Sequence, residues 1–205
     1  MGGETLLVDA GTGNLHSVYN ALQAAGVTVR LVTRPDELTG AARIILPGVG
    51  AFAGFMDGLR SRELVNPLKD LVGQGIPLLG ICVGMQALFE TSEENGLHAG
   101  LGLLPGHVKR LILPQGYKVP HTGWNQLWPR EGMGLFEGIP AGSYAYFNHT
   151  FYCVPADDTI TACRTDYGME ITAAVCSGSL YGVQFHPEKS QQVGRRLLQN
   201  FLRIT

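Results

Sequence analysis

The sequence predicts an α/β fold: an open, mostly parallel sheet flanked by helices and continued by an antiparallel β extension. In the first half, short apolar runs alternate with helical stripes, which is typical of a parallel sheet covered on both faces. From about Gly102 to Phe185, β-rich runs follow one another with Gly, Pro and Asp turns between them, which indicates antiparallel strands. The 205 residues suffice for one well-buried core, so we expect a single domain over residues 1–205.

The first half opens with a predicted strand at residues 5–9, "TLLVD", and a helix follows it. The apolar face of this helix consists of Leu15, Val18, Tyr19 and Leu22. Two strands, "VTVRLV" and "RIILP", come next, and Asn66 and Pro67 then signal the start of a second helix. The apolar face of the second helix consists of Leu68, Leu71 and Val72.

Residues 77–90, "PLLGICVGMQALFE", change from a buried strand to a helix, and Cys82 stands at the change. The helical stripe expected after the strand consists of Met85, Leu88 and Phe89. Gly80 and Gly84 have no side chains to crowd a tight corner, so the backbone can turn sharply there. We therefore expect the thiol of Cys82 to be pushed outward at this corner.

The second half is predicted to be mainly β structure. Its runs are, in order, "GHVKRLIL", "GWNQLW", "SYAYFNHTFYCV", "TITACR", "ITAAVCS" and "SLYGVQF". The chain then closes with "QQVGRRLLQNFL", which predicts an amphipathic helix. The apolar face of that helix consists of Val193, Leu197, Leu198 and Phe201.

Charge and hydropathy narrow the classes of function. With a net charge of −2 and 16% charged residues, the chain gives no electrostatic reason to bind nucleic acid or an anionic membrane. So sparsely charged a surface is compatible with partial coverage by another protein. The sequence lacks a signal-peptide pattern at its start and has no run of roughly 18 apolar residues, so a cytoplasmic protein is expected.

The cysteines and histidines give little support for a metal site. The four cysteines contain no CxxC pair, which argues against a zinc ribbon or a thioredoxin motif and fits a reducing compartment. Cys153, Cys163 and Cys176 lie in predicted strands, where burial is the expected role. The histidines are too scattered to suggest a metal site.

Two glycine-rich loops follow predicted strands. "DAGTGNLHSV" has two glycines in the position of a dinucleotide-binding loop, but His16 replaces the third, and backbone freedom alone explains the turn. "ILPGVGAF" is either a flexible turn or a loop whose N–H groups receive an oxyanion. In a parallel sheet this loop and Cys82 lie at the same carboxyl edge, where active sites of open α/β folds collect.

A second polar cluster lies in "YGVQFHPEKS". Pro187 favours an extended backbone at His186, and residues two apart on an extended segment point to the same side. The Glu188 carboxylate can therefore accept a hydrogen bond from one imidazole nitrogen, as in an oriented base, although a solvated turn stays an open alternative.

The thiol, the imidazole and the N–H-rich loop match the requirements of acyl transfer. A free thiol is only slightly ionised at neutral pH, so it gains from a neighbouring imidazole and a helix N-terminus. Cys82 is the cysteine whose sequence context offers both.

These motifs resemble those of the class I, triad-type glutamine amidotransferases. The general likeness is carried by "PGVG", "GICVGMQ" and "GVQFHPE". A narrower likeness, to the glutaminase subunits of imidazole glycerol phosphate synthases, is carried by "GTGNLHSV", "LPGVGAF", "VPHTGWNQL", "YFNHTF" and "QFHPEKS". The matches extend over nearly the whole chain.

The resemblance implies a flavodoxin-like fold and the hydrolysis of glutamine to glutamate and ammonia. It implies Cys82 as the nucleophile that forms a γ-glutamyl thioester, His186 as the base and acid, and Glu188 as the support of the imidazole. The implied oxyanion hole consists of Val49, Gly50 and Val83. The implied glutamine-binding residues are Gly50, Gln86, Glu94, Thr150 and Phe151. The family more often has Tyr at position 151, a change that is harmless if only the backbone contacts the substrate.

The resemblance also implies a partner and no metal or organic cofactor. The partner is a separate cyclase subunit, a β/α barrel that joins the glutaminase in a heterodimer. It uses the ammonia to make imidazole glycerol phosphate and aminoimidazole carboxamide ribotide in histidine biosynthesis. The expected contact residues are Asn14, Trp124, Tyr146 and Lys189, with buried packing as the alternative for the two aromatic residues.

Two alternative functions stay open. The first keeps the glutaminase chemistry but delivers ammonia to anthranilate, pyridoxal phosphate or GMP synthesis, against which "YFNHTF" and "VPHTGWN" argue. The second is a cysteine-based redox sensor or a scaffold. The complete set of Cys, His and Glu disfavours it, because a sensor needs a reactive thiol but no His–Glu pair.

Overall fold

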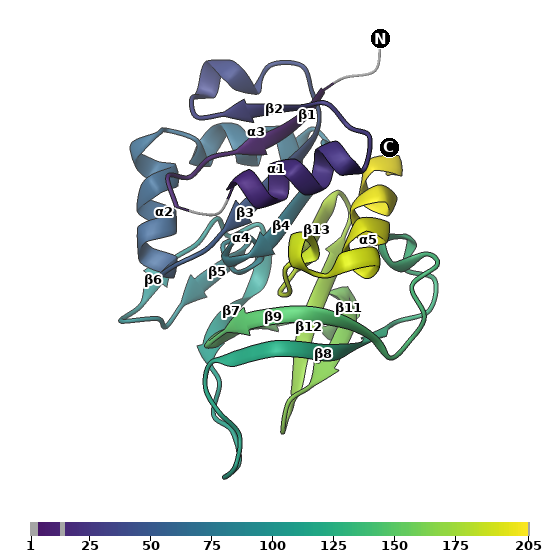
Figure 1. Ribbon diagram of the computed structural model, residues 1–205. Helices are drawn as coiled ribbons and strands as arrows, with labels where there is room; N and C mark the ends of the chain where they lie inside the picture. Colours follow the sequence, from purple (N-terminus) through teal and green to yellow (C-terminus); the bar gives the residue numbers. More distant parts are fainter. Residues whose placement is uncertain (1–3, 13–14, 205) are drawn as a thin grey trace.

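The computed structural model describes residues 4–12 and 15–204, shown in Figure 1. The strands are β1 (Glu4–Val8), β2 (Val29–Val32), β3 (Ala41–Gly48), β4 (Leu78–Cys82), β5 (Phe89–Ser92), β6 (His98–Ala99), β7 (Leu104–Arg110), β8 (His121–Pro129), β9 (Ser143–His149), β10 (Phe151–Pro155), β11 (Thr161–Asp166), β12 (Glu170–Ser177) and β13 (Leu180–Val183). The helices are α1 (Leu15–Ala24), α2 (Phe52–Ser61), α3 (Val65–Gly73), α4 (Val83–Gln86) and α5 (Gln191–Arg203). Short 3-10 turns are η1 (Pro35–Leu38), η2 (Gly134–Phe136), η3 (Asp158–Ile160) and η4 (Pro187–Lys189).

The described residues form two sheets. The larger has nine strands in the order β2-β1-β3-β4-β13-β12-β11-β8-β9, and the smaller has four in the order β10-β7-β5-β6. From β2 to β13 every neighbouring pair in the larger sheet is parallel. From β13 to β9 every pair is antiparallel, so the α/β class and the antiparallel extension are both as predicted.

Helices cover both faces of the parallel half because its crossovers run in opposite directions. The chain moves from β1 to β2 on one side and from β3 to β4 on the other, and right-handed crossovers then place their helices on opposite faces. In Figure 1, α1 and α5 lie in front of the sheet and α3 lies behind it. Strand β4 is buried along its whole length, as its apolar sequence predicts.

Strand β13 is shared by the two halves of the larger sheet. It pairs in parallel with β4, where Val183 lies opposite Ile81, and antiparallel with β12, where Val183 lies opposite Ala174. The sequence run "SLYGVQF" was expected in the antiparallel extension, but its strand also completes the parallel half. The segment that follows β13 therefore emerges beside Cys82, at the carboxyl end of β4.

Two local expectations were wrong. The helix predicted from Met85, Leu88 and Phe89 is only the short α4, because Phe89 enters β5 of the smaller sheet. The carbonyl of Leu88 accepts hydrogen bonds from the N–H groups of Leu103 and Leu104, both at 2.9 Å, which ends the helix. The run "SYAYFNHTFYCV" divides into β9 and β10, which belong to different sheets.

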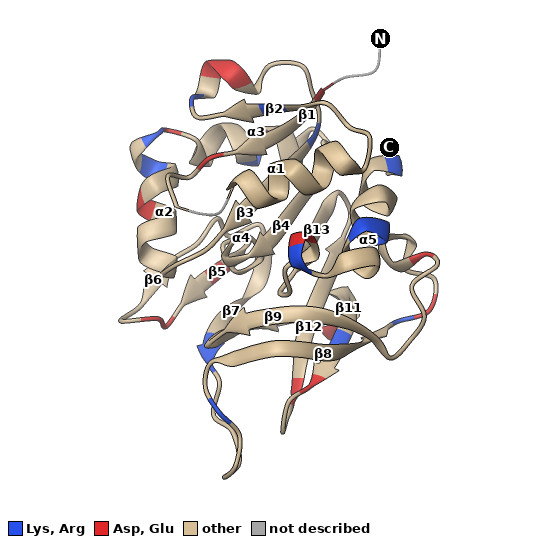
Figure 2. Cartoon of the chain, in the orientation of Figure 1, with Lys and Arg blue, Asp and Glu red and all other residues tan. Residues whose placement is uncertain are grey.

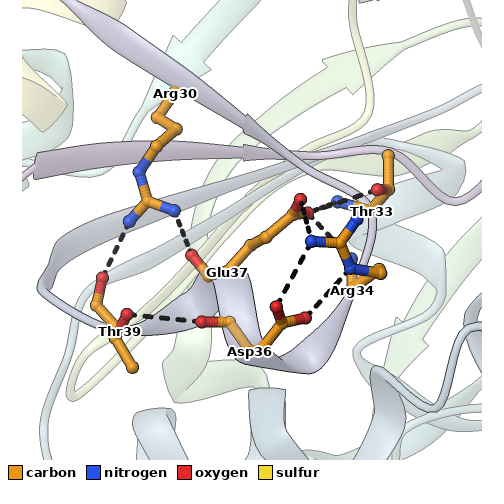
Figure 3. Close-up of polar contacts among 6 residues, drawn as sticks. All are labelled: Arg30, Thr33, Arg34, Asp36, Glu37 and Thr39. Carbon is orange, nitrogen blue, oxygen red and sulfur yellow. Dashed lines mark hydrogen bonds and ion pairs between the residues drawn. The ribbon is translucent and has the colours of Figure 1, made fainter.

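Polar contacts fix the turn beside the edge strand β2 (Figure 3). Arg30 donates hydrogen bonds to the carbonyl oxygens of Glu37 and Thr39. The Glu37 carboxylate accepts from the N–H groups of Thr33, at 2.7 Å, and Arg34, at 3.0 Å. Exposed ion pairs contribute little individually, so the main effect is that η1 is held next to β2 with its backbone groups satisfied.

Helix α5 is the amphipathic helix predicted for the end of the chain, and it buries Leu197, Leu198 and Phe201. Asn200 is buried with them and donates to the carbonyl oxygens of Leu135, at 3.0 Å, and Glu137, at 2.8 Å. These bonds tie η2 to the helix. Within residues 4–12 and 15–204, none of the helices has the length and hydropathy needed to span a membrane.

Candidate active site

Cys82 occupies a strained corner between β4 and α4. Its φ is 55°, a left-handed conformation that residues other than glycine rarely adopt. The backbone around it is too crowded for side chains: a Cβ on Gly80 would lie 2.6 Å from the carbonyl oxygen of Gly84. A Cβ on Gly84 would lie 1.8 Å from that of Leu46. The two glycines therefore permit the sharp turn, although the thiol that it presents is only 4% exposed.

Because α4 is short, its helix dipole at Cys82 is weaker than the sequence predicted. A macrodipole grows with the number of aligned peptide units, so the single turn Val83–Gln86 offers less than the longer helix that was expected. The local N–H of Val83 still begins that turn. Stabilisation of an anion here therefore depends on nearby donors and charges more than on a helix.

His186 and Glu188 form a buried pair beside this corner. The His186 Nδ1 lies 2.8 Å from Glu188 Oε1, and the two side chains are only 4% and 3% exposed, which is not the environment of a solvated turn. The backbone N–H of His186 donates to the carbonyl oxygen of Tyr146 at 2.9 Å. Ser190 Oγ donates to the carbonyl oxygen of His186 at 2.7 Å, so both sides of the residue are anchored.

The surroundings of His186 favour its charged form. Burial is the largest single influence and lowers the pKa, but hydrogen bonds to Cys82 and Glu188, together with the negative charges of these groups, raise it to about 10. At neutral pH the imidazole is therefore protonated. The protonated imidazole therefore lies next to the sulfur of Cys82 and the carboxylate of Glu188.

One cavity of about 350 Å³ collects nearly all the expected site residues, and its volume is in the range of small-molecule sites. It is lined by Val49, Gly50, Cys82, Val83, Gln86, Glu94, Pro120, Asn148, His149, Thr150, Phe151, His186 and Lys189. Glu188 does not line the cavity, and it contacts the lining residue His186 through Nδ1 of the imidazole. The expected oxyanion and glutamine-binding residues all line this cavity.

The "PGVG" loop reaches the cavity from the strand beside β4. Gly48, the last residue of β3, pairs with Cys82 in the sheet register. The chain then leaves the sheet as Val49 and Gly50, and Gly50 has a φ of +86°, which favours glycine. Backbone N–H groups of this loop therefore lie beside the carboxyl end of β4.

Side-chain amides and a carboxylate complete the polar wall of the cavity. Gln86 Nε2 donates to the carbonyl oxygen of Phe151 and to Gln184 Oε1, both at 3.1 Å. Glu94 follows β5, and its Oε2 accepts the N–H of Phe52, the first residue of α2, at 2.7 Å. This carboxylate therefore ties the start of α2, a helix that was not predicted, to the cavity.

Two buried histidines beside the cavity were not predicted as site residues. His121 Nδ1 lies 2.9 Å from His149 Nε2, and His149 Nδ1 lies 2.9 Å from the carbonyl oxygen of Phe151. A carbonyl only accepts, so His149 carries its proton on Nδ1, and His121 must donate to its other nitrogen. Asn125 Nδ2, at 3.2 Å, then donates to the remaining nitrogen of His121.

Both histidines are neutral at neutral pH. Burial lowers the pKa of His121 to about 4, and burial, with a smaller contribution from the charge of His121, lowers that of His149 to about 3. Each stands in a motif quoted for the resemblance, "VPHTGWNQL" or "YFNHTF". Their pairing depends on the register of β8 and β9, where they face each other.

The expected partner residues gather next to this cavity. Lys189 Nζ lies 5.5 Å from the centre of the Tyr146 ring, and the Trp124 ring lies 6.0 Å from that of Tyr146. Trp124 is 47% exposed, so the alternative of buried packing fails for it, whereas Tyr146 is half-buried. Asn14, the other expected contact residue, lies outside the described residues.

The remaining cysteines differ from Cys82. Cys153 and Cys163 are buried as expected, whereas Cys176 is only half-buried. Burial raises the pKa of Cys163 and of Cys176 to about 12, and raises that of Cys153 well above the ordinary range. These thiols stay protonated and unreactive at neutral pH. In the part of the chain that the structure describes, no group of three or more His, Cys, Asp or Glu side chains is arranged to hold a metal ion.

Comparison with known proteins agrees with this geometry. A family model described as "Glutamine amidotransferase class-I" matches residues 6–204. Proteins called imidazole glycerol phosphate synthase subunit HisH are similar over almost their full length. The one from Moorella thermoacetica (strain ATCC 39073 / JCM 9320) is 50% identical, with 95% of this chain and 92% of that protein covered. The one from Dehalococcoides mccartyi (strain CBDB1) is also 50% identical, with 97% and 96% covered.

Solved structures show the same fold at lower identity. A crystal structure of a glutamine amidotransferase matches with a TM-score of 0.76 and 21% identity over 96% of both chains. A chain of PurLQS from Thermotoga maritima matches with a TM-score of 0.77 and 22% identity over 98% of both chains. At this level of identity the likeness concerns the fold alone.

Proposed function

Because the chain belongs to the class I glutamine amidotransferase family, we propose that it is the glutaminase subunit of an imidazole glycerol phosphate synthase. The observation that carries the chemistry is the cavity in which a strained cysteine, a buried His–Glu pair and a loop of free N–H groups meet. The relatives that share half of the sequence over nearly their full length favour this synthase over others that use the same fold.

In the first half of the proposed reaction, the Cys82 thiolate attacks the carbon of the glutamine side-chain amide. The carbonyl oxygen becomes an oxyanion, which N–H groups of Val83 and of the Val49–Gly50 loop stabilise. The carbon–nitrogen bond then breaks, and His186 gives its proton to the leaving ammonia. The products of this half are free ammonia, a neutral imidazole and a γ-glutamyl thioester on the cysteine.

In the second half, water replaces the sulfur. The neutral His186 takes a proton from the attacking water, the carbon–sulfur bond breaks, and glutamate leaves as the thiolate reforms. Glu188 orients the imidazole in both halves and stabilises its charge when it is protonated, from 2.8 Å away. The thiolate and the protonated imidazole with which the attack begins are both restored at the end of the cycle.

Glutamine is proposed to bind against Gln86, Glu94 and the backbone of Thr150 and Phe151, with Gly50 closing the other side. Glu94 then shares its carboxylate between the N–H of Phe52 and the ammonium group of the substrate. The hydrogen bonds of Phe151 run through its carbonyl oxygen. This favours a backbone role at the position where the family more often has Tyr.

The proposed partner is the cyclase subunit, a separate β/α barrel that receives the ammonia and makes imidazole glycerol phosphate and aminoimidazole carboxamide ribotide. The β8–β9 ribbon supports a docking face because it contains no Lys, Arg, Asp or Glu, as Figure 2 shows. It exposes large aromatic side chains, namely Trp124 at 47%, Trp128 at 50% and Tyr144 at 53%. A heterodimer in the cytoplasm is part of this proposal, and the free thiols support the reducing location.

The test is the release of glutamate from glutamine, with and without the cyclase and its nucleotide substrate. We expect slow release by the isolated chain and a large increase in the loaded complex, because the oxyanion donors are on a loop. Cys82→Ala should abolish release, whereas Cys176→Ala, the same change at a half-buried position in β12, should leave it intact. Glutamate release that survives Cys82→Ala would exclude the nucleophile.

A co-purification experiment separates the choice of synthase from the chemistry. If the chain binds the cyclase and the complex uses glutamine to form imidazole glycerol phosphate, the cyclase is the subunit that receives the ammonia, as proposed. Binding to an anthranilate, pyridoxal phosphate or GMP synthase instead would overturn the acceptor and leave the glutaminase reaction in place.

A further inference from the structure

Gln184 is a fully buried polar side chain between the nucleophile and the glutamine-binding wall. It directly follows β13, and its backbone N–H donates to the carbonyl oxygen of Ala173 at 2.8 Å, which holds this residue against β12. Its side chain contacts Cys82 and Gln86, and His186 follows two positions later, before the 3-10 turn η4 that contains Glu188.

The neighbouring groups determine the orientation of the Gln184 amide. The carbonyl oxygen of Phe151 only accepts, so the Gln86 amide must turn its Nε2 toward it. The same Nε2 donates its second proton to Gln184 at 3.1 Å, so the oxygen of Gln184 faces Gln86. The nitrogen of Gln184 is therefore left facing the sulfur of Cys82, at 3.6 Å, a normal separation for a donor to the larger sulfur atom.

We propose that Gln184 is a positioning residue that holds the Cys82 sulfur and stabilises its thiolate through the Nε2–H bond. The imidazolium of His186 is the other partner of this sulfur, so the thiolate has two donors, which come from residues two positions apart. The amide does not titrate, so it continues to donate after His186 has given its proton to ammonia. This role concerns the nucleophile of the proposed function and rests on it.

Other titratable groups around the sulfur do not substitute for this donor. Glu188 contacts His186 through Nδ1 of the imidazole and is the acceptor in their pair. The thiol of Cys153, near enough to interact with Cys82, is fully buried and stays protonated because burial raises its pKa. His149, near His186, is neutral and directs its proton to Phe151.

The test compares Gln184→Glu, which keeps an oxygen for Gln86 but removes the donor, with Gln184→Met, which removes both groups. Gln199→Glu on α5 is the matched control for the chemical change. The first readout is the rate of Cys82 alkylation by iodoacetamide as a function of pH, and the second is glutamine hydrolysis in the complex with the cyclase. A hydrogen bond to a charged group is worth about 10- to 100-fold in an equilibrium or rate.

In Gln184→Glu we expect the alkylation midpoint to move to higher pH by about one unit or more, with kcat lowered about 10- to 100-fold and KM changed less. Gln184→Met should move the midpoint and also raise KM, because Gln86 loses its acceptor. Gln199→Glu should match the wild type. A wild-type midpoint in a folded Gln184→Met variant would overturn the proposal, because this variant removes the Nε2–H donor without placing a charge beside the sulfur.

If either variant fails to fold in a thermal melt, the wild-type complex supplies the measurement. The side-chain amide signal of Gln184 in an NMR titration should change with the same midpoint as Cys82 alkylation, and a signal that does not respond to pH in that range would overturn the proposal. Alkylation does not require glutamine turnover. Failure of the wild type to hydrolyse glutamine would therefore count against the proposed function. The effect of Gln184 on the pH dependence of Cys82 alkylation could still be measured.

Discussion

Replacing His149 by Asn should change how the stability of the protein depends on pH. The folded state holds His149 neutral, because burial and the charge of His121 lower its pKa to about 3. In the unfolded chain an ordinary histidine titrates near pH 6.5. When folding lowers the pKa of a histidine, the free energy of unfolding decreases as the pH falls below the pKa of the unfolded state. The reason is that only the unfolded state takes up the proton.

The size of this effect follows from the two pKa values. Between pH 7 and pH 5 the unfolded chain becomes almost fully protonated at this histidine and the folded state does not, which lowers the free energy of unfolding by about 2 kcal/mol. Asn cannot titrate, so the free energy of unfolding of His149→Asn should lack this decrease between pH 7 and pH 5. At pH 7 the variant should itself be less stable by about 1–3 kcal/mol, because the buried N–H of His121 loses its acceptor. The difference between the two proteins should therefore nearly vanish at pH 5.

Urea unfolding followed by circular dichroism at pH 5, 6 and 7 measures both quantities. His121 and His186 are present in both proteins, so their titrations largely cancel in the comparison. His16→Asn, on the exposed side of α1, is the control and should follow the wild-type curve. The reasoning is refuted if wild type and His149→Asn lose the same free energy of unfolding between pH 7 and pH 5.

Three further predictions concern other parts of the structure. Gly84→Ala should lower the free energy of unfolding by more than about 3 kcal/mol in a urea titration, because its Cβ would lie 1.8 Å from the Leu46 carbonyl oxygen. The control is Gly54→Ala on α2, where a Cβ would meet open space, and this change should be neutral or slightly stabilising. Asn200→Leu should cost about 2–4 kcal/mol, since the buried carbonyl oxygen of Leu135 and the partly buried one of Glu137 lose their donor. A cost below about 1 kcal/mol in thermal or urea unfolding would contradict this. His186 has a pKa raised to about 10, so its contribution to the free energy of unfolding is complete below about pH 6.5 and is lost as the pH rises through 10. His186→Gln should lack that decline in unfolding experiments between pH 7 and pH 10. Equal declines in the two proteins would contradict this prediction.

The parallel half of the fold was predictable because its signals are local. Strands such as β4 are uniformly apolar, and helix α3 has Pro67 in its first turn and is followed by Gly75, whose φ is +86°. The helix after Cys82 was wrong for the opposite reason. Its apolar spacing fits a helix, but Phe89 gains more by entering β5, where it pairs with Leu104, a partner that local spacing does not show.

The same division applies to the site. Cys82, His186 and Glu188 stand in short motifs whose chemistry can be worked out from neighbouring residues, and the oxyanion loop follows directly from a strand end. The roles of Gln184 and of the His121–His149 pair depend on which strands lie next to each other. Sequence position alone does not bring these groups together, so they are recognised only once the register of the sheet is known.

The position of β13 between β4 and β12 has a consequence for synthesis of the chain. Strands β1 to β4 and the whole antiparallel unit emerge from the ribosome before the strand that joins them, so the pairings of β13 with β4 and with β12 wait for residues 180–183. Until then β4 has an unpaired apolar edge, the kind of surface that promotes aggregation. The segment that closes the sheet also contains His186, the proposed catalytic base. In the nascent chain, Cys82 is therefore present before His186 has been synthesised. The two side chains come together only after β13 has paired with β4 and β12.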